Sequence, residues 1–152
     1  MANVRDLIKM TSEEVDAFLH ERHTMSVATI GPDGQPHVVA MWYGFLDGAP
    51  AFETYRKSQK VKNLERDPRM TCLIEDGDRY DLLRGVELVA RGTVVDDKEA
   101  LRTIARSLFE RYDTGFGPDQ GEEYIDFMVA KRVAVRVDIE DVVSWDHGKI
   151  AG

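Results

Sequence analysis

The sequence predicts a mainly β fold, an antiparallel β-barrel with helices packed outside it. Short apolar runs separated by turn residues indicate strands joined as hairpins, and amphipathic segments between some of them indicate helices. Helices that alternate with such strands cover a sheet or barrel from outside. At 152 residues, we expect a single cofactor-binding domain over residues 1–152. A closed barrel would leave no strand edge unpaired.

The composition is that of an ordinary globular protein, with 43% hydrophobic and 32% charged residues and a formal net charge of -8. The acidic balance argues against nucleic acid as a partner, because a phosphate backbone needs a broad basic face. No apolar run approaches the roughly 20 residues that span a bilayer. The first residues lack the apolar stretch of a secretory signal. We therefore expect a cytoplasmic protein that binds neither membranes nor nucleic acid.

The N-terminal half begins with a helix. Thr11 and Glu14 have the spacing of a capping box ahead of apolar residues at helical intervals. β-rich runs separated by turn residues then indicate strands, and Asp67-Pro68 stops a short helix. In chain order we expect a helix after residue 11, strands over 26–30, 37–43, 51–54 and 69–75, and a short helix over 61–66.

The C-terminal half alternates between strands and helices. The run 85–95 is long enough for a curved strand, with Gly92 as its bend or bulge. A helical apolar face follows over 96–111, where Asp96 with Glu99 can cap the helix, and a shorter helix spans 122–131. The residues of 133–139 alternate between apolar and other side chains, which predicts a strand with its valines and Ile139 on the core face.

The segment Thr54–Lys60 is the strongest candidate site. It leads from a strand into a helix and holds two aliphatic hydroxyl groups and three cations in an acidic chain. The free N–H groups and positive dipole end of a helix stabilise an anion, and Lys60 can add a charge-assisted hydrogen bond. We therefore expect a phosphate to bind here. A solvated cationic loop is the alternative, and alternation turns at most one of Arg56 and Lys57 toward the site.

Other reactive residues give weaker signals. Cys72 is the only cysteine, and its strand-like surroundings predict a small buried side chain. His20 and His23 have the spacing of a metal pair, yet no carboxylate or cysteine pattern completes a site, so we expect no metal. No serine lies in a Gly-x-Ser-x-Gly turn. We assign no catalytic residue from these patterns.

The order of several motifs resembles a known family. The motifs are Ala28–His37, Met41–Tyr43, Phe52–Thr54, Ser58–Lys60, Asn63-Leu64, Arg66–Pro68, Arg84–Val86, Lys131–Val135 and Ser144–His147. Together they resemble the pyridoxamine 5'-phosphate oxidase-like split-barrel superfamily. Within it the chain is similar to the flavin/deazaflavin oxidoreductases of the B type, which use coenzyme F-420 or flavin mononucleotide (FMN).

The resemblance implies a fold, an assembly and a set of binding residues. The fold would be a six-stranded antiparallel split β-barrel of the FMN-binding type, in a homodimer with cofactor sites at the interface. Lys60 and Ser58 would hold the cofactor phosphate, with Thr54 and Gln59 nearby. Residues expected along the ring are Val39, Ala40 and Met41, with Tyr80 approaching from a loop.

The implied function is an oxidoreductase that binds coenzyme F-420 and transfers a hydride from the reduced deazaflavin to a small conjugated substrate. The cofactor would perform the redox step while the protein positions it, with Tyr80 as a candidate general acid. An FMN-dependent oxidoreductase and a non-catalytic cofactor or ligand carrier are the alternatives. Gln59 stands where pyridoxamine phosphate oxidases carry Arg, and Asp146-His147 follow Trp145 where those enzymes place another Arg. Loss of these guanidinium groups argues against vitamin B6 as substrate.

Overall fold

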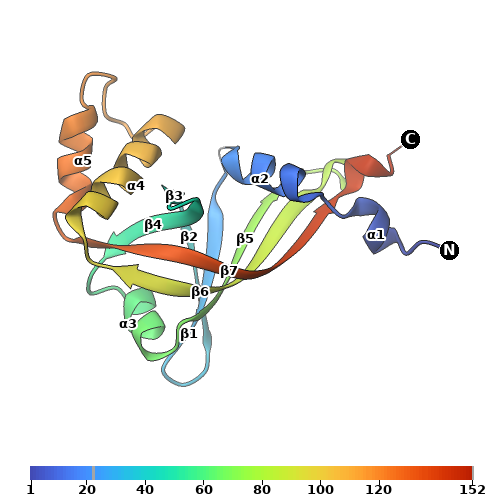
Figure 1. Cartoon of the computed structure of the whole chain (residues 1–152), viewed down its shortest axis with the longest axis horizontal. Coiled ribbons are helices and arrows are strands. Elements are labelled where there is room, and N and C mark those ends of the chain that lie inside the picture. The colour runs from blue at the N-terminus through green and yellow to red at the C-terminus, as the bar shows by residue number, and fades with distance from the viewer. Residues whose placement is uncertain (22, 152) are drawn as a thin grey trace.

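The computed structural model describes residues 1–21 and 23–151 as a curled, seven-stranded antiparallel sheet with helices on its outside (Figure 1). The strands are β1 (Met25–Ile30), β2 (Pro36–Met41), β3 (Gly44–Leu46), β4 (Ala49–Tyr55), β5 (Arg69–Asp76), β6 (Arg84–Val95) and β7 (Arg132–Asp146). The helices are α1 (Val4–Ile8), α2 (Ser12–His20), α3 (Gln59–Arg66), α4 (Lys98–Arg111) and α5 (Gly121–Val129), with short 3₁₀ turns η1 (Tyr80–Leu82) and η2 (His147–Lys149). The mainly β class and the flanking helices are confirmed.

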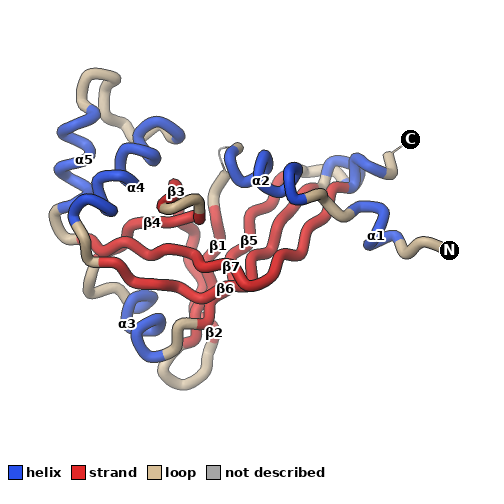
Figure 2. The backbone as a smooth tube through the Cα atoms, in the orientation of Figure 1, coloured by secondary structure: helices blue, strands red, loops and turns tan. Residues whose placement is uncertain are grey.

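The sheet is a half-barrel with two edges. Its strand order is β2-β1-β5-β6-β7-β4-β3, and the long strands β6 and β7 run through both halves of the curl (Figure 2). The expectation that closure removes every edge was therefore wrong, since β2 and β3 end the order. The seventh strand is β3, whose three residues are too few for a period-two pattern. It pairs with β4 across a tight turn in which Asp47 and Gly48 have positive φ angles of 53° and 78°, as a two-residue hairpin requires.

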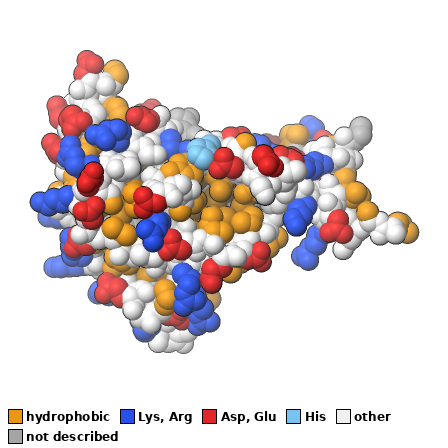
Figure 3. Space-filling view, viewed as in Figure 1, with side chains coloured by type: hydrophobic (Ala, Val, Ile, Leu, Met, Phe, Trp, Pro, Cys, Tyr) orange, Lys and Arg blue, Asp and Glu red, His pale blue; other side chains and the backbone are white. Residues whose placement is uncertain are grey.

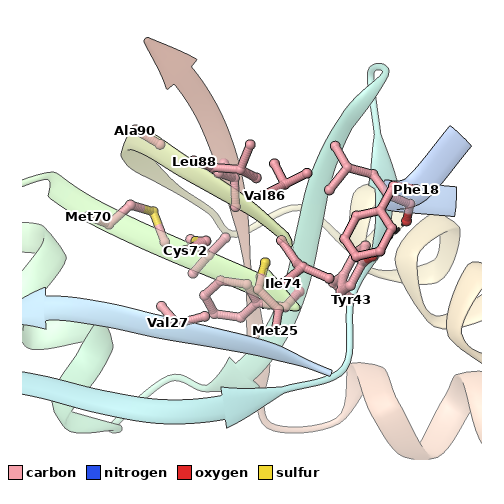
Figure 4. Packing of buried hydrophobic residues seen from close by; sticks show 14 of the residues in the cluster. Phe18, Met25, Val27, Tyr43, Met70, Cys72, Ile74, Val86, Leu88 and Ala90 are labelled. Carbon is pink, nitrogen blue, oxygen red and sulfur yellow. Dashed lines mark hydrogen bonds between the residues drawn. The ribbon is translucent and has the colours of Figure 1, made fainter. Parts of the chain in front are cut away.

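Two apolar clusters stabilise the fold, one on each face of β4. The larger fills the curl and includes Phe18, Met25 and Phe52 (Figure 4). The smaller joins Ala51 of β4 to the apolar faces of α4 and α5. Successive strand residues point to opposite faces, so β4 contributes to both clusters. Cys72 is fully buried in the larger one, as predicted, and burial raises the pKa of its thiol to about 12.

A bulge between β6 and β7 changes which side chains face the core. Val89 pairs with Asp141 and Ala90 with Ile139, so Glu140 is the extra residue. The bulge shifts the alternation by one position: Ile139 is 41% exposed, while Val142 packs on the core. The prediction that Ile139 faces the core was thus wrong. Gly92, the predicted bulge, pairs in register; a Cβ there would lie 2.8–2.9 Å from Met70 and Leu64.

The helix starts follow the sequence with one correction. Thr11 and Glu14 form the predicted capping box at α2. At α4 the cap is Asp97, whose carboxylate accepts a hydrogen bond from the Ala100 N–H at 3.0 Å. Asp96 instead pairs with Arg56 across the surface. No helix in the described part of the chain is both long and apolar enough to cross a membrane.

Candidate functional site

A groove lies where the curl fails to close. β3 pairs only with residues Ala49–Ala51 of β4, so the edge of Phe52–Tyr55 on that side has no strand partner among the described residues. The end of β2 lies across from this edge, and a cavity of about 540 Å³ separates them. Its lining residues are Ala40, Met41, Trp42, Glu53, Thr54, Tyr55, Lys60, Leu108, Tyr124, Met128 and Arg132.

One side of this groove carries residues of the segment predicted to bind an anion. The Lys60 ammonium group donates a hydrogen bond to Thr54 Oγ1 at 2.7 Å, and Thr54 Oγ1 donates to Ser58 Oγ at 3.4 Å. Burial lowers the pKa of Lys60, and no acidic neighbour among the described residues offsets it. Ser58 is the N-cap of α3, yet its side chain caps no backbone N–H. The first turn of a helix has N–H groups without intrahelical acceptors, so this end of α3 keeps donors for an anion.

Gln59 points away from the groove. Its side-chain amide donates to Asn63 Oδ1 at 2.8 Å, and the buried Asn63 donates to Thr29 Oγ1 of β1 at 3.0 Å. Arg66 also donates to the carbonyl of Ile30. These bonds fix α3 against β1, and with it the position of Lys60.

The end of β2 forms the opposite wall. Ala40 and Met41 line the cavity, while Val39 turns inward against the core and is absent from the lining. Met41 also packs on the core. Trp42 is 43% exposed and stacks on Tyr112, with ring centroids 4.7 Å apart and planes at 7°. The stack presents a flat aromatic wall to the groove.

Tyr80 and Trp145 lie elsewhere in the single chain. Tyr80 is 71% exposed and its ring packs edge-on against His147, 4.6 Å between centroids. The C-terminal turn that contains His147 lies at the opposite end of the long axis from α4 and α5 (Figure 1). Trp145 belongs to β7 and occupies the space that a Cβ at Gly85 would fill, 2.1 Å from its ring. Neither residue lines the cavity of its own chain.

Arg56 and Lys57 also lie outside the main cavity. They line an adjoining hollow with Tyr55 and Lys131. The Arg56 guanidinium is paired with Asp96, which leaves Lys57 as the uncompensated cation of the two. Of the histidine pair, His20 stacks on Phe45, and no group of three or more potential metal ligands lies together among the described residues.

The second side of the groove holds a residue that the sequence did not indicate. Glu53 is only 4% exposed and lines the cavity from β4. Burial raises the pKa of its carboxyl to about 8, against the opposing effects of Arg132 and of the nearby Ala105 backbone N–H, which lies outside normal hydrogen-bond geometry. Neither carboxyl oxygen has a hydrogen-bond partner among the described residues. A single glutamate in a strand carries no motif, so only the fold could reveal its burial beside a cavity.

Three comparisons with known proteins agree with this architecture. Residues 11–146 match the family model for pyridoxamine 5'-phosphate oxidase. Over 105 residues the chain is 32% identical to an F420H(2)-dependent biliverdin reductase of Mycobacterium tuberculosis, which covers 68% of this chain and 73% of that protein.

Solved structures show the same fold. A conserved hypothetical protein from Mycobacterium tuberculosis superposes with a TM-score of 0.90 at 46% identity, covering 97% of this chain and 92% of that one. The heme storage protein HutZ from Vibrio cholerae has a TM-score of 0.67 at 18% identity, covering 90% and 97%. The latter identity shows the fold alone. The match over residues 11–146, on a half-barrel with a groove at its opening, shows that the chain belongs to the pyridoxamine 5'-phosphate oxidase family.

Proposed function

We propose that this protein is an oxidoreductase that binds coenzyme F-420 in the groove between β2 and β4 and reduces a small conjugated substrate. The observation that carries the proposal is Lys60, a half-buried cation with a hydroxyl neighbour and no acidic partner among the described residues. A desolvated ammonium group beside a helix N-terminus favours an anion such as a phosphate. The relative that is named an F420H(2)-dependent reductase supports the deazaflavin as the cofactor.

Different residues of the chain would contact the phosphate and the ring of the cofactor. Lys60, Ser58 and Thr54 would hold the phosphate, and the first-turn N–H groups of α3 would add donors. The backbone of Ala40 and Met41 would lie along the polar edge of the ring, with Trp42 as an aromatic wall. When bound, the reduced deazaflavin supplies a hydride. The protein's part is to bind and orient the reactants and to exclude water from the groove.

A homodimer is part of the proposal. In the strand registers Ala40, Ser26, Leu73, Glu87 and Val143 form one row across the sheet. Leu73 is 36% and Val143 42% exposed, so this face presents apolar side chains to solvent. Ala40 belongs both to this row and to the cavity lining. A second copy docked on the row would therefore border the groove.

Other exposed apolar residues fit the same arrangement. Val38 lies two residues before Ala40, on the same face of β2, and is 61% exposed. Separately from this row, Figure 3 shows hydrophobic side chains gathered in the middle of the face that it draws, between more highly charged ends. We propose that the partner supplies Tyr80, since that residue does not line its own chain's cavity. Sedimentation equilibrium tests the assembly: a dimer supports it, and a monomer at micromolar concentration contradicts it.

Vitamin B6 oxidation is not part of the proposal. Gln59 bonds within α3, and Arg56, the arginine of the Thr54–Lys60 segment, is paired with Asp96. Lys60 is a point charge, whereas arginine grips a phosphate with two parallel donors. The turn therefore suits the phosphate of a cofactor, and the chain has no second arginine grip for the phosphate of a vitamin B6 substrate among the described residues.

The test is a binding titration followed by turnover. The purified protein is titrated with coenzyme F-420 and, separately, with FMN, while tryptophan fluorescence is followed. We expect saturable binding of F-420, and oxidation of reduced F-420 when biliverdin or another conjugated electrophile is added. Tighter binding of FMN, with turnover, would support the flavin enzyme instead. Binding without turnover across a broad panel would identify a carrier, and failure to bind either cofactor would defeat the proposal.

A further inference from the structure

Glu53 is the one acidic side chain that the described residues place in the lining of the groove. It lies on β4 opposite Ala134 of β7, one residue before Thr54. Adjacent strand residues point to opposite faces, so Glu53 faces α4 and α5 while Thr54 faces Lys60. The two residues therefore line one cavity from the two faces of the same strand.

The surroundings of Glu53 favour its neutral form. Leu108 of α4 and Met128 of α5 contribute apolar lining next to it. The titratable groups that face this region are Tyr124 of α5, Arg132 of β7, Tyr55 on the same face of β4, and Lys60 across the cavity. Burial outweighs the effects of Arg132 and of the Ala105 backbone N–H, and raises the pKa of Glu53 to about 8. Proximity to Glu53 also contributes to raising the pKa of Tyr124.

A neutral carboxyl group has an O–H that needs an acceptor. Buried polar groups in proteins are nearly always hydrogen-bonded, and an unsatisfied one costs about 1–3 kcal/mol. Glu53 has no such partner of normal geometry among the described residues. Both carboxyl oxygens are buried, but Glu53 lines the cavity, so a bound molecule can supply the acceptor once the carboxyl group turns toward the opening. A carbonyl oxygen is the acceptor that a conjugated substrate offers.

We propose that Glu53 is the proton donor of the reaction, acting on a carbonyl compound held between β4 and the helices α4 and α5. The inference rests on the proposed function for its source of electrons. Reduction of a conjugated carbonyl adds a hydride to one carbon, and the reduced deazaflavin, which supplies it, is oxidised. The Glu53 O–H bond breaks as its proton passes to the enolate oxygen or carbon of the substrate. Water then reprotonates the carboxylate, which balances the two-electron reduction.

This role differs from the one suggested for Tyr80. That tyrosine is exposed and packs against His147, outside the cavity of its own chain. Glu53 lines the cavity that also contains Lys60. General acid catalysis needs a group within hydrogen-bond reach and with a pKa near the working pH. Glu53 meets the second condition, with a pKa raised to about 8, and its place in the cavity lining puts it next to the space where a substrate would bind.

The first experiment measures the protonation of Glu53 directly. Protein labelled with carboxyl-¹³C glutamate is titrated by NMR, and Glu53→Gln identifies the resonance. We expect a midpoint near 8. A midpoint in the usual range near 4.3 would overturn the inference, whatever cofactor the protein binds. Circular dichroism and thermal unfolding establish that Glu53→Gln is folded.

The second experiment separates proton donation from binding. With the electrophile that the wild type reduces, Glu53→Gln should lower the single-turnover rate by about 100-fold or more and leave the dissociation constant of F-420 unchanged. Glu65→Gln, an exposed change on α3, should alter neither. An equal rate in Glu53→Gln and wild type would overturn the role of Glu53. Failure of the wild type to bind F-420 would instead overturn the proposed function.

The wild type alone provides a third readout that needs no variant. Its single-turnover rate should fall above about pH 8 with one ionisation, because the carboxylate has no proton to give. A rate that stays level to pH 10 would contradict proton donation by Glu53.

Discussion

The two faces of β4 at the groove bury groups of opposite charge in different ways. On one face Lys60 is anchored by Thr54, beside the N-terminus of α3. On the other face Glu53 has no hydrogen-bond partner among the described residues. Burial lowers the pKa of Lys60 and raises that of Glu53. Each shift favours the neutral form, so both groups are kept at a cost to the stability of the empty protein.

The difference lies in what each group needs from a ligand. Lys60 is held in place and needs an anion to offset its charge, which suits a tightly bound phosphate. Glu53 needs only an acceptor for one O–H, which suits a substrate that binds and dissociates in each turnover. Sites of this kind commonly trade stability for function. The comparison predicts that changes on one face affect cofactor affinity and changes on the other affect proton transfer.

The largest expected effect is on stability, in Glu53→Leu. The folded protein keeps the Glu53 proton up to about pH 8, whereas an unfolded chain loses it near 4.5. The contribution of this group to stability is therefore highest below pH 4.5, falls as the pH rises, and levels off above 8. The loss amounts to about 3–5 kcal/mol. Leucine fills the site without a charge and should remove this pH dependence.

Urea unfolding at several pH values between 4.5 and 9 measures that effect. The free energy of unfolding of Glu53→Leu should exceed that of the wild type by an amount that grows with pH. Other titrating groups are common to both proteins and cancel in the difference. A difference that stays constant with pH would show that Glu53 ionises alike in the folded and unfolded chain.

The next effect is on affinity, in Thr54→Val. Valine keeps the shape of a side chain that is 5% exposed but removes the acceptor for Lys60 and the donor to Ser58. A hydrogen bond contributes about 0.5–1.5 kcal/mol, so F-420 should bind roughly 3- to 10-fold more weakly. The NMR titration of Glu53 should be unchanged. A shift in that titration, with equal F-420 affinity, would reverse the roles of the two faces.

A smaller effect is expected in Arg132→Gln. Arg132 lines the Glu53 side, donates to Tyr55 Oη at 3.2 Å and stacks over the Tyr55 ring. Its charge lowers the pKa of Glu53 against the effect of burial. Its removal should raise that pKa further and move the alkaline limb of the rate profile to higher pH. Lys131→Gln, next in the chain and outside the main cavity lining, is the control; a downward shift in Arg132→Gln would contradict the assignment.

The smallest perturbation concerns the fluorescence signal. Trp42 lines the cavity, whereas Trp145 lines a separate hollow with Arg5 and Val143. Trp42→Phe should lose most of the change in emission on F-420 binding, and Trp145→Phe should keep it. The opposite result would place the bound ring at the second hollow.

Much of the fold follows from local patterns in the sequence. The capping box at Thr11, the hairpin turn after Ile30 and the long alternating strands all lie where their residues predict. The bulge at Glu140 could not be predicted, because it depends on how β7 pairs with β6 rather than on its own composition. β3 was missed since its pairing, and not its three residues, defines it.

The candidate site also combines residues that the sequence predicts with residues whose role depends on the fold. The anion turn is contiguous in sequence, so its hydroxyls and cations could be found together, and the structure brings Lys60 and Thr54 into contact. Glu53 acquires its character from α4, α5 and β7, which are distant in sequence. Gln59 and Val39 lie next to residues that line the cavity but point away from it themselves. Side-chain direction is set by the helix and strand geometry, which residue type alone does not reveal.

The most direct test of the division between the two faces is one set of F-420 titrations at pH 7 with wild type, Lys60→Ala, Lys62→Ala and Glu53→Gln. Lys62 is exposed on the same helix as Lys60 and serves as the charge-matched control. We expect Lys60→Ala to raise the dissociation constant by about 10- to 150-fold, the scale of a charge-assisted hydrogen bond. Lys62→Ala and Glu53→Gln should match the wild type. Equal affinity in Lys60→Ala and wild type would contradict the account.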